Sequence, residues 1–332
     1  MKTILLSRTD SIGDVVLTLP LAGFLKEQLP DSHIIFLGKN YTKAVVDCCK
    51  YVDTFISWDD FSLLNENDKI LKLKSLNIDI IVHVFPNKDI AILAKKAGIG
   101  TRIGTSHRIF HWTACNKLVH FSRKKSNLHE SELNLKLISP IVDSSDVSFE
   151  NILNYIAFEP KTLFPELKQF IVSEKFNLII HPKSKGSARE WGLDNYNKLI
   201  SLLSPEKFNI ILTGTEEEGK LFREKLVLPN KQVNDLSGKL SLEQLIYLIS
   251  ISDGLLACST GPLHIAAMLN INTIGLYPPI KPMHPERWNP IGNNTKVFVK
   301  DITCNKCRKG RVCNCIIDIS PENVVGYLEG IL

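Results

Sequence analysis

The stretch that decides the fold is Ser259-Thr260-Gly261-Pro262-Leu263-His264. It follows the apolar run from Gly254 to Ala257, which predicts a buried strand, and it opens an apolar segment that predicts a helix over 262–269. A hydroxyl residue before Gly-Pro is typical of a capped helix start with proline in the first turn. Unbonded amides and the positive end of the helix dipole make such a start favourable for an anion. We therefore predict a strand, an anion-binding turn and a helix.

The last residue of this stretch, His264, falls in the first turn of the predicted helix. From there an imidazole N–H can donate a hydrogen bond to a phosphate oxygen. A histidine at such a position is also commonly a packing residue inside the protein. The residue alone does not decide between the two roles.

The same alternation of strands and helices runs through the whole chain. Apolar runs in the first half predict strands over 4–6, 33–38, 54–56 and 78–84. After residue 160, strands are predicted over 176–181, 208–213, 254–257 and 273–277. Helices are predicted between the later strands, near 194–204, 216–226, 241–251 and 262–269. This spacing indicates parallel βαβ units.

The predicted fold class is α/β, with two Rossmann-like domains over residues 1–160 and 161–332. A chain of 332 residues is long for one core, and prolines with polar neighbours mark a boundary in 159–165. We expect parallel sheets that face a central cleft, with ligands at the carboxyl ends of the strands. No Gly-x-Gly-x-x-Gly follows the first strand, which removes most support for a dehydrogenase.

The composition is that of an ordinary globular protein. The chain has 44% hydrophobic and 23% charged residues, and its net charge of +5 comes from 40 basic and 35 acidic residues. These values argue against disorder and against a nucleic-acid-binding protein. No run approaches the roughly 20 apolar residues of a membrane span, so a cytoplasmic protein without a signal peptide is expected. Eight cysteines without a secretion signal argue for reduced thiols.

The loop after the first strand reads Arg8-Thr9-Asp10-Ser11-Ile12-Gly13-Asp14. Gly13 is expected to permit a tight turn, and Asp14 is expected at the start of the next helix, with Asp10 and Gly13 at the same ligand-facing edge. Aspartate favours the cap position of a helix, which is one role for Asp14. A carboxylate there can instead take a proton from an attacking hydroxyl, as a general base does.

A second polar loop, His181 to Trp191, follows the first strand of the second half. It contains the cations Lys183, Lys185 and Arg189 together with two serines. Cations and hydroxyls in a loop before a helix suit a phosphate. A solvated basic loop is the alternative.

Four cysteines cluster near the C-terminus. Cys304-x-x-Cys307 is followed by Cys313-x-Cys315, and four thiolates could enclose a structural zinc ion. One residue between the second pair is tighter than in a typical zinc knuckle. Loop thiols or a disulfide are the alternative, and neither case gives the cluster a catalytic role. Ser320 and Pro321 then open a last helix, as cap and first residue.

The ordered set of these segments resembles glycosyltransferase family 9, the ADP-heptose:lipopolysaccharide heptosyltransferases. The resemblance covers nearly the whole chain. The segments that carry it are Arg8 to Pro20, Arg102-Ile103-Gly104, His129-Glu130, Lys183 to Trp191, Asp235 to Gly238, Thr260 to Ala267, and Gly275-Leu276-Tyr277.

The resemblance implies a GT-B fold, in which the N-terminal domain binds the acceptor and the C-terminal domain binds the nucleotide sugar. It implies an inverting, metal-independent transfer in which Asp14 deprotonates the acceptor hydroxyl. In GT-B proteins the last helix often packs back on the N-terminal domain, and this is expected here.

The resemblance also implies donor-binding residues. Arg189, two residues before Trp191, corresponds to a cation that contacts the donor phosphates, and Lys183 and Ser184 belong to the same loop. Glu218 lies near the place of a carboxylate that binds the ribose, although three consecutive glutamates leave the register open. The turn from Ser259 through Thr260, Gly261, Pro262 and Leu263 to His264 would hold the diphosphate.

One departure concerns the sugar. Relatives often have aspartate before the Ser/Thr-Gly of this turn, whereas this chain has Ser259, which offers a hydroxyl but no charge. The expected reaction is transfer of heptose from ADP-heptose to a lipopolysaccharide core or related surface glycan, with no cofactor. The alternatives are another nucleotide sugar as donor, or a non-catalytic protein that binds nucleotide sugars. The expected partners are a nucleotide sugar and a glycan or glycolipid, with peripheral contact to the inner membrane and no nucleic acid.

Overall fold

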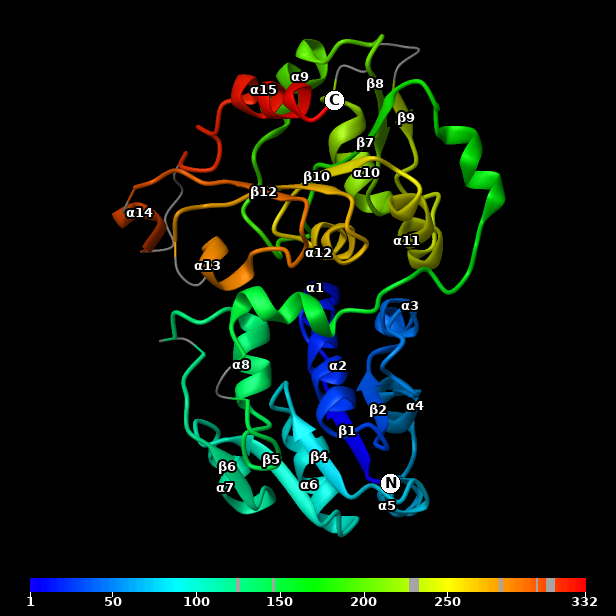
Figure 1. Ribbon diagram of the computed structural model, residues 1–332, viewed down its shortest axis with the longest axis vertical. Coiled ribbons are helices and arrows are strands. Elements are labelled where there is room, and N and C mark those ends of the chain that lie inside the picture. Colours follow the sequence, from blue (N-terminus) through cyan, green and yellow to red (C-terminus); the bar gives the residue numbers. More distant parts are fainter. Residues whose placement is uncertain (124–125, 145–146, 227–232, 281–282, 303, 309–313) are drawn as a thin grey trace. The chain divides into compact units, whose positions relative to one another are not determined.

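The computed structural model of the chain describes residues 1–123, 126–144, 147–226, 233–280, 283–302, 304–308 and 314–332. It divides into two compact units, Met1–Glu159 and Pro160–Leu332, coloured blue to green and green to red in Figure 1. Each unit contains one six-stranded sheet in which all neighbouring strands run parallel. The predicted α/β class with two Rossmann-like domains is confirmed.

The first unit has the strand order β3-β2-β1-β4-β5-β6. The strands are β1 Thr3–Ser7, β2 His33–Gly38, β3 Thr54–Ser57, β4 Ile80–His83, β5 Thr101–Thr105 and β6 Lys117–Val119. The helices between and after them are α1 Ile12–Val16, α2 Leu19–Gln28, α3 Lys43–Asp47, α4 Trp58–Leu63, α5 Glu66–Ser75, α6 Lys88–Lys96, α7 Ile109–Ala114 and α8 Glu130–Lys136. The described part of this unit also contains the 3-10 helices η1 Asn40–Thr42 and η2 Phe149–Tyr155.

The second unit has the order β12-β11-β10-β7-β8-β9. Its strands are β7 Phe176–His181, β8 Phe208–Leu212, β9 Val233–Asp235, β10 Gly254–Cys258, β11 Asn272–Leu276 and β12 Thr295–Phe298. Its helices are η3 Pro165–Phe170, α9 Leu193–Leu202, α10 Glu216–Arg223, α11 Leu242–Ser250, α12 Gly261–Met268, α13 Pro285–Trp288, α14 Asn305–Arg308 and α15 Pro321–Gly330.

Both sheets have the same topology. Numbered within its own unit, each sheet has the order 3-2-1-4-5-6, which is the Rossmann order. The direction in which successive strands are added to the sheet reverses between β1 and β4 in the first unit and between β7 and β10 in the second. Ligands of such sheets bind beyond the carboxyl ends of the strands at this reversal, because the flanking loops diverge there. The loops after β1, β4, β7 and β10 are therefore the places to look for a site.

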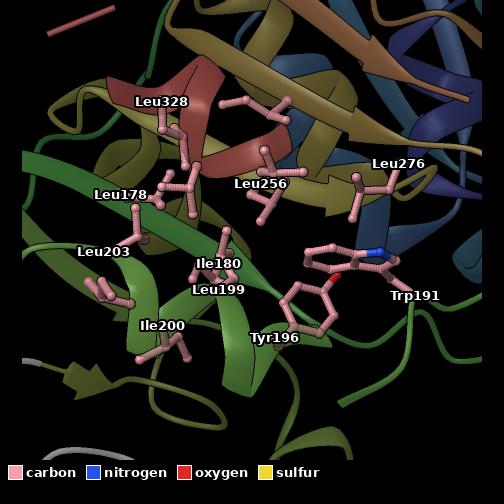
Figure 2. Close-up of a cluster of buried hydrophobic side chains, with 14 of the residues drawn as sticks. Leu178, Ile180, Trp191, Tyr196, Leu199, Ile200, Leu203, Leu256, Leu276 and Leu328 are labelled. Carbon is pink, nitrogen blue, oxygen red and sulfur yellow. The ribbon is translucent and has the colours of Figure 1, made fainter. Parts of the chain in front are cut away.

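The core of the second unit explains the position of its first loop. Trp191, which ends this loop, is fully buried among apolar residues of β7, β10 and α9 (Figure 2). Its ring meets Tyr196 edge to face, with ring centroids 5.0 Å apart, and its indole N–H donates to the carbonyl oxygen of Ile319 at 2.9 Å. This anchor fixes the end of the polar loop that begins at His181.

The last helix belongs to the same core. α15 packs against α9, beside which it lies in Figure 1, and its Val324 and Leu328 are fully buried. Its apolar face therefore belongs to the core of the second unit. Within the described residues, no helix combines the length and apolar character needed to cross a membrane.

Candidate functional site

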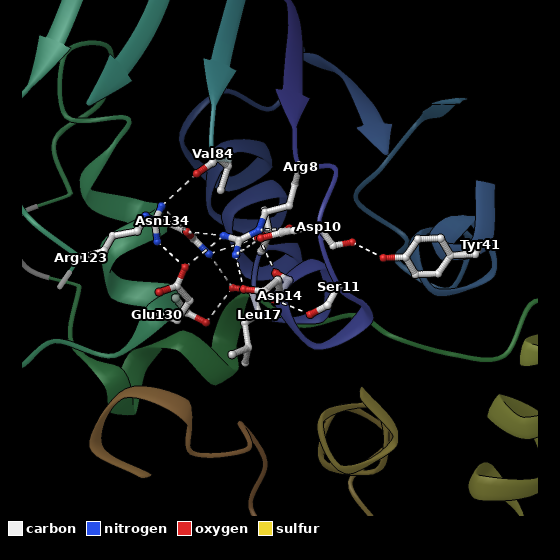
Figure 3. Close-up of polar contacts among 12 residues, drawn as sticks. Arg8, Asp10, Ser11, Asp14, Leu17, Tyr41, Val84, Arg123, Glu130 and Asn134 are labelled. Carbon is white, nitrogen blue, oxygen red and sulfur yellow. Dashed lines mark hydrogen bonds and ion pairs between the residues drawn. The ribbon is translucent and has the colours of Figure 1, made fainter. Parts of the chain in front are cut away.

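A buried guanidinium, that of Arg8, organises the loop after β1 (Figure 3). Its Nε donates to Asp10 at 2.8 Å, one terminal nitrogen contacts Asp14, and the other lies 3.1 Å from an oxygen of Glu130. Burial lowers the pKa of Arg8, but the three carboxylates together raise it above its ordinary value. Arg8 is therefore a permanent cation that fixes the carboxylates around it.

Helix α8 supplies the other side of this cluster. Glu130 and Asn134 are buried, and both accept hydrogen bonds from Arg8. Arg123 contacts Glu130 as well, and it donates to Asn134 at 3.0 Å and to the carbonyl oxygen of Val84 at 3.2 Å. The Arg8 cluster, meaning Arg8, Asp10, Asp14, Glu130, Asn134 and Arg123, thus joins the loops after β1 and β4 to α8.

Asp14 is not the helix cap. Helix α1 begins at Ile12, Ser11 occupies the cap position, and Asp14 lies in the first turn. Its carboxylate contacts the side chains of Arg8 and Ser11 rather than a backbone amide. The side chain of Asp14 is 19% exposed, whereas that of Glu130 is 1% exposed. Asp14 is therefore oriented by its neighbours and still accessible to a substrate.

The other two predicted residues of this loop have different environments. Burial raises the pKa of Asp10 to about 6 against the attraction of Arg8, and repulsion from Asp14 adds to the rise. The backbone oxygen of Asp10 also accepts a hydrogen bond from the hydroxyl of Tyr41. Gly13 has a helical position inside α1 and is not among the glycines with positive φ, so the expected tight turn is wrong.

In the second unit, the loop after β7 is held by an internal carboxylate. Glu190 contacts the ammonium group of Lys183 and accepts hydrogen bonds from the amide and the hydroxyl of Ser184, at 3.2 and 3.1 Å. The hydroxyl of Ser184 also donates to the carbonyl oxygen of Ala188 at 3.0 Å, and Ser184 is buried. Both predicted donor residues, Lys183 and Ser184, therefore shape this loop.

Arg189 differs from its neighbours. Its side chain is half-buried, and no hydrogen bond or ion pair joins it to any residue that the structure describes. Partly buried guanidinium groups normally have carboxylate or carbonyl partners because desolvation of a charge is costly. A half-buried cation without such a partner favours an anionic ligand.

Burial distinguishes Glu218 from the two glutamates before it. Glu218 is 6% exposed at its side chain, whereas Glu216 and Glu217 are 47% and 74% exposed. One oxygen of Glu218 accepts the amide of Thr215 at 2.8 Å, and Thr215 in return accepts the amide of Glu218 at 3.3 Å. Glu218 therefore forms the capping box of α10, a structural role beside the predicted ribose contact.

The turn that opens α12 lies beyond the carboxyl end of β10. Thr260 occupies the cap position, but its hydroxyl makes no cap hydrogen bond, which differs from the usual role of such a residue. Thr260 is 5% exposed, and its Oγ1 is buried without a hydrogen-bond partner in the described structure. A buried hydroxyl without a partner at a helix N-terminus is available to a ligand.

The remaining residues of this turn are mostly packed. Pro262, Leu263 and His264 are buried, so His264 combines a packing position with its place in the first turn of α12. Gly261, half-buried, is the first residue of the helix.

The first residue of the turn, Ser259, contacts a tyrosine that follows β11. Burial raises the pKa of this residue, Tyr277, and a hydrogen bond with Ser259 offsets part of that rise.

The sheet brings the donor candidates of the second unit to one edge. β7 pairs with β10 in parallel, with Ala257 opposite His181, so their loops leave side by side. On the other side of β7, His181 donates or accepts a hydrogen bond with Thr213 at 3.0 Å and lies 4.0 Å from Glu218. The residues predicted in these three loops therefore share the carboxyl edge of one sheet. Asp10, Gly13 and Asp14 belong to the corresponding edge of the first unit.

The C-terminal cysteines are partly described. The sulfurs of Cys304, Cys307 and Cys315 lie within 4.8 Å of one another, and Cys313 falls outside the described residues. Among the cysteines in the described ranges, no two are joined in a disulfide. A disulfide, one of the alternatives that the sequence left open, is therefore not formed among these three.

The sequence did not single out His83, which ends β4 opposite Ser7 of β1. Both of its ring nitrogens are buried without a hydrogen-bond partner in the described structure, and its ring lies 5.5 Å from that of His111. Burial lowers the pKa of His83 to about 3, and repulsion from His111 and Arg102 adds to the effect. His83 is thus neutral at the carboxyl edge of the first sheet.

This buried imidazole should make the protein sensitive to acid. Unfolded histidine titrates near 6.5, so below that pH the unfolded chain binds a proton that the native chain excludes. Stability from His83 is present above pH 6.5 and is lost as pH falls. Between pH 7.5 and 5.5 this group alone would cost about 1.4 kcal/mol. Urea unfolding at both pH values should show a smaller loss in His83→Leu than in the wild type.

His107 provides the control for this experiment, because its side chain is exposed. His107→Gln should keep the pH dependence of the wild type. An equal loss of stability in His83→Leu and the wild type would contradict a neutral, buried His83.

Two Rossmann-type sheets in tandem, each with polar loops at its carboxyl edge, are typical of the GT-B fold. Residues 71–315 match the family model described as Glycosyltransferase family 9 (heptosyltransferase). The chain belongs to this family and is a glycosyltransferase. The resemblance predicted from its motifs is confirmed.

Individual relatives agree with this assignment. A Haemophilus influenzae protein named "Putative glycosyltransferase" is 26% identical over 310 residues, which is 89% of this chain and 88% of that protein. Lipopolysaccharide heptosyltransferase 2 of Escherichia coli is 26% identical over 155 residues, 44% of each chain. The match to this second relative therefore covers less than half the length of that protein.

Solved structures share the fold. The E. coli ADP-heptose lps heptosyltransferase II has a TM-score of 0.78 and 19% identity, covering 100% of this chain and 98% of its own. E. coli heptosyltransferase WaaC, in a structure with ADP, has a TM-score of 0.71 and 17% identity, covering 99% and 100%. At these identities the likeness establishes the GT-B fold alone.

Proposed function

We propose that this protein transfers heptose from ADP-heptose to a lipopolysaccharide core or related surface glycan, with inversion at the anomeric carbon and without a metal ion. The family membership supports heptosyl transfer. The observation that carries the mechanism is the half-buried Arg189, a cation without a protein partner among the described residues, at the edge that also holds the Thr260 turn. The proposal places this reaction in the cytoplasm, with the acceptor at the inner membrane.

The second unit binds the donor diphosphate in this proposal. The amides of the Ser259 to His264 turn, the positive end of α12 and the hydroxyl of Thr260 face an anion. Arg189 and Lys183 offset the negative charge that grows on the leaving diphosphate. Stabilisation of this kind is usually the largest catalytic contribution, because the charges are in place before the reaction. These cations do the work that a metal ion does in other glycosyltransferases.

The first unit activates the acceptor. The carboxylate of Asp14 takes the proton of the acceptor hydroxyl as that oxygen attacks the anomeric carbon of the sugar. The bond from that carbon to the diphosphate oxygen breaks, ADP leaves with the electron pair, and Asp14 later releases its proton to water. Attack opposite the leaving group inverts the anomeric carbon. Arg8 and Ser11 hold the carboxylate in one orientation, which supports this role.

A second class of donor, a nucleotide-linked hexose, competes with ADP-heptose. Ser259 replaces the aspartate usual in relatives, and its hydroxyl is engaged with Tyr277. A nucleotide-linked hexose would therefore also suit this position, and Glu218 would bind the ribose of either donor.

A donor panel separates the two candidates. ADP-heptose should raise the melting temperature of the purified chain more than UDP- or GDP-linked hexoses at equal concentration, since only bound ligand stabilises the folded state. Mass spectrometry should then detect a heptose added to a truncated lipopolysaccharide acceptor. Stabilisation and transfer with a UDP- or GDP-hexose alone would refute the heptose assignment. Donor binding without transfer to any acceptor or to water would identify a non-catalytic binding protein.

A further inference from the structure

Three cysteine sulfurs converge near the end of the second unit. Cys304 immediately precedes the short helix α14, Cys307 lies in it, and Cys315 lies in the turn before α15. The three sulfur atoms all lie within 4.8 Å of one another. A tetrahedral zinc ion with bonds of about 2.3 Å requires its sulfur ligands to lie roughly 3.8 Å apart. The three thiols therefore need little movement to share one ion.

The chain geometry around the thiols resembles that of a metal knuckle. Cys304 and Cys307 lie three residues apart at the start of α14, and the amide of Cys307 donates to the sulfur of Cys304 at 3.4 Å. Cys307 and Cys315 are 3% and 7% exposed. A buried cysteine often serves only as a small apolar residue in the core. Apolar packing alone, however, does not require three cysteine sulfurs to converge.

The surroundings suit thiolates that bind a soft metal ion. Ile280 is buried against Cys307 and Cys315, and Met283 packs beside them. These apolar neighbours keep water from the sulfurs, and thiolate ligands favour zinc, iron and copper over magnesium or calcium. A disulfide could engage only two of the three thiols and would leave the third unpaired.

The thiols also connect two loops. β12 pairs with β11 in parallel, with Phe298 opposite Leu276, so the segments that follow both strands leave the same edge of the sheet. Ile280 and Met283 belong to the segment after β11, and the cysteines belong to the segment after β12. An ion at the thiols would hold these two segments together at the edge that carries the Thr260 turn.

We propose that Cys304, Cys307 and Cys315 bind one thiophilic transition-metal ion, zinc or iron. This ion has a structural role, because it holds together the segments that follow β11 and β12 in the second unit. Each thiol that binds releases its proton to solvent, and no electron is transferred. The ion takes no part in glycosyl transfer, so this site and the donor site are independent.

Metal analysis of the purified full-length chain tests the proposal. Mass spectrometry of the metals should find about one equivalent of zinc plus iron per chain, and the proportion of the two identifies the native ion. Cys304→Ser and Cys307→Ser should each lose most of it. The matched control is Cys115→Ser in the first unit, because Cys115 and Cys315 are both 7% exposed. It should retain the full metal content.

A second measurement does not depend on the folding of the variants. Chelator-treated wild-type protein titrated with cobalt(II) should develop a thiolate-to-cobalt charge-transfer band that saturates near one equivalent, about the stoichiometry of a single site. The proposal is overturned if wild-type protein grown with zinc and iron contains less than about a tenth of an equivalent, or if cobalt(II) gives no such band. An intact mass showing a disulfide in this segment would overturn it as well.

Discussion

Replacing Asp14 with asparagine is expected to lower kcat by roughly 10²–10⁴ while the Kd for the donor stays within about twofold. Asparagine keeps the shape of the side chain and its contact with Ser11, but it cannot take a proton. Arg8 remains paired with Asp10 and Glu130, at 2.8 and 3.1 Å, so the loop should stay in place. Initial rates of ADP release and calorimetric titration with donor measure the two quantities separately.

Asp79→Asn is the matched control, because Asp79 lies at the opposite, amino edge of the same sheet. Its carboxylate accepts the amide of Thr3 at 2.8 Å, a bond that an amide oxygen can also accept. This variant should keep normal rates. Near-normal turnover in Asp14→Asn with intact donor binding would rule out Asp14 as the general base.

Replacing Arg189 with glutamine is expected to lower kcat/KM by roughly 10²–10³, because a preorganised cation at the leaving diphosphate is lost. Folding should be unaffected, since Arg189 makes no hydrogen bond or ion pair with any residue in the described ranges. Donor affinity should fall as well, which the same calorimetric titration measures. Equal activity of the variant and the wild type would place the diphosphate away from Arg189.

The control for charge alone is Lys198→Gln. Lys198 lies in α9, is 55% exposed and pairs with Glu322 of α15. Removing this cation changes the net charge of the protein by the same amount as Arg189→Gln, and it should leave kcat/KM within about twofold, as an exposed ion pair contributes little.

The strands that the sequence predicts best are those made of apolar runs. Runs such as Ile4-Leu5-Leu6 and His33 to Gly38 are buried on both faces and therefore carry a continuous apolar signal. The strands β5, β6, β9 and β12 were not predicted. Each contains charged or polar residues that interrupt the apolar signal, and its place in the sheet depends on hydrogen bonds to a neighbouring strand.

The features of the candidate site also divide into those that the sequence could locate and those that it could not. Loops at the carboxyl ends of parallel strands could be located from the order of strands and helices, which is why the sequence indicated Asp14, Arg189 and Thr260. The ion pair between Arg8 and Glu130 could not be found in this way, because it joins residues 122 positions apart through the placement of α8. The missing cap bond of Thr260 was equally hidden, since it depends on the rotamer of one side chain.

The most direct test of the account is a crystal structure of the protein with ADP bound. We expect the diphosphate to lie on the backbone amides at the start of α12, with the hydroxyl of Thr260 and the guanidinium of Arg189 within hydrogen-bonding distance of its oxygens, roughly 2.7–3.2 Å. A diphosphate bound to the first unit, or bound to the second without contact to either residue, would contradict it.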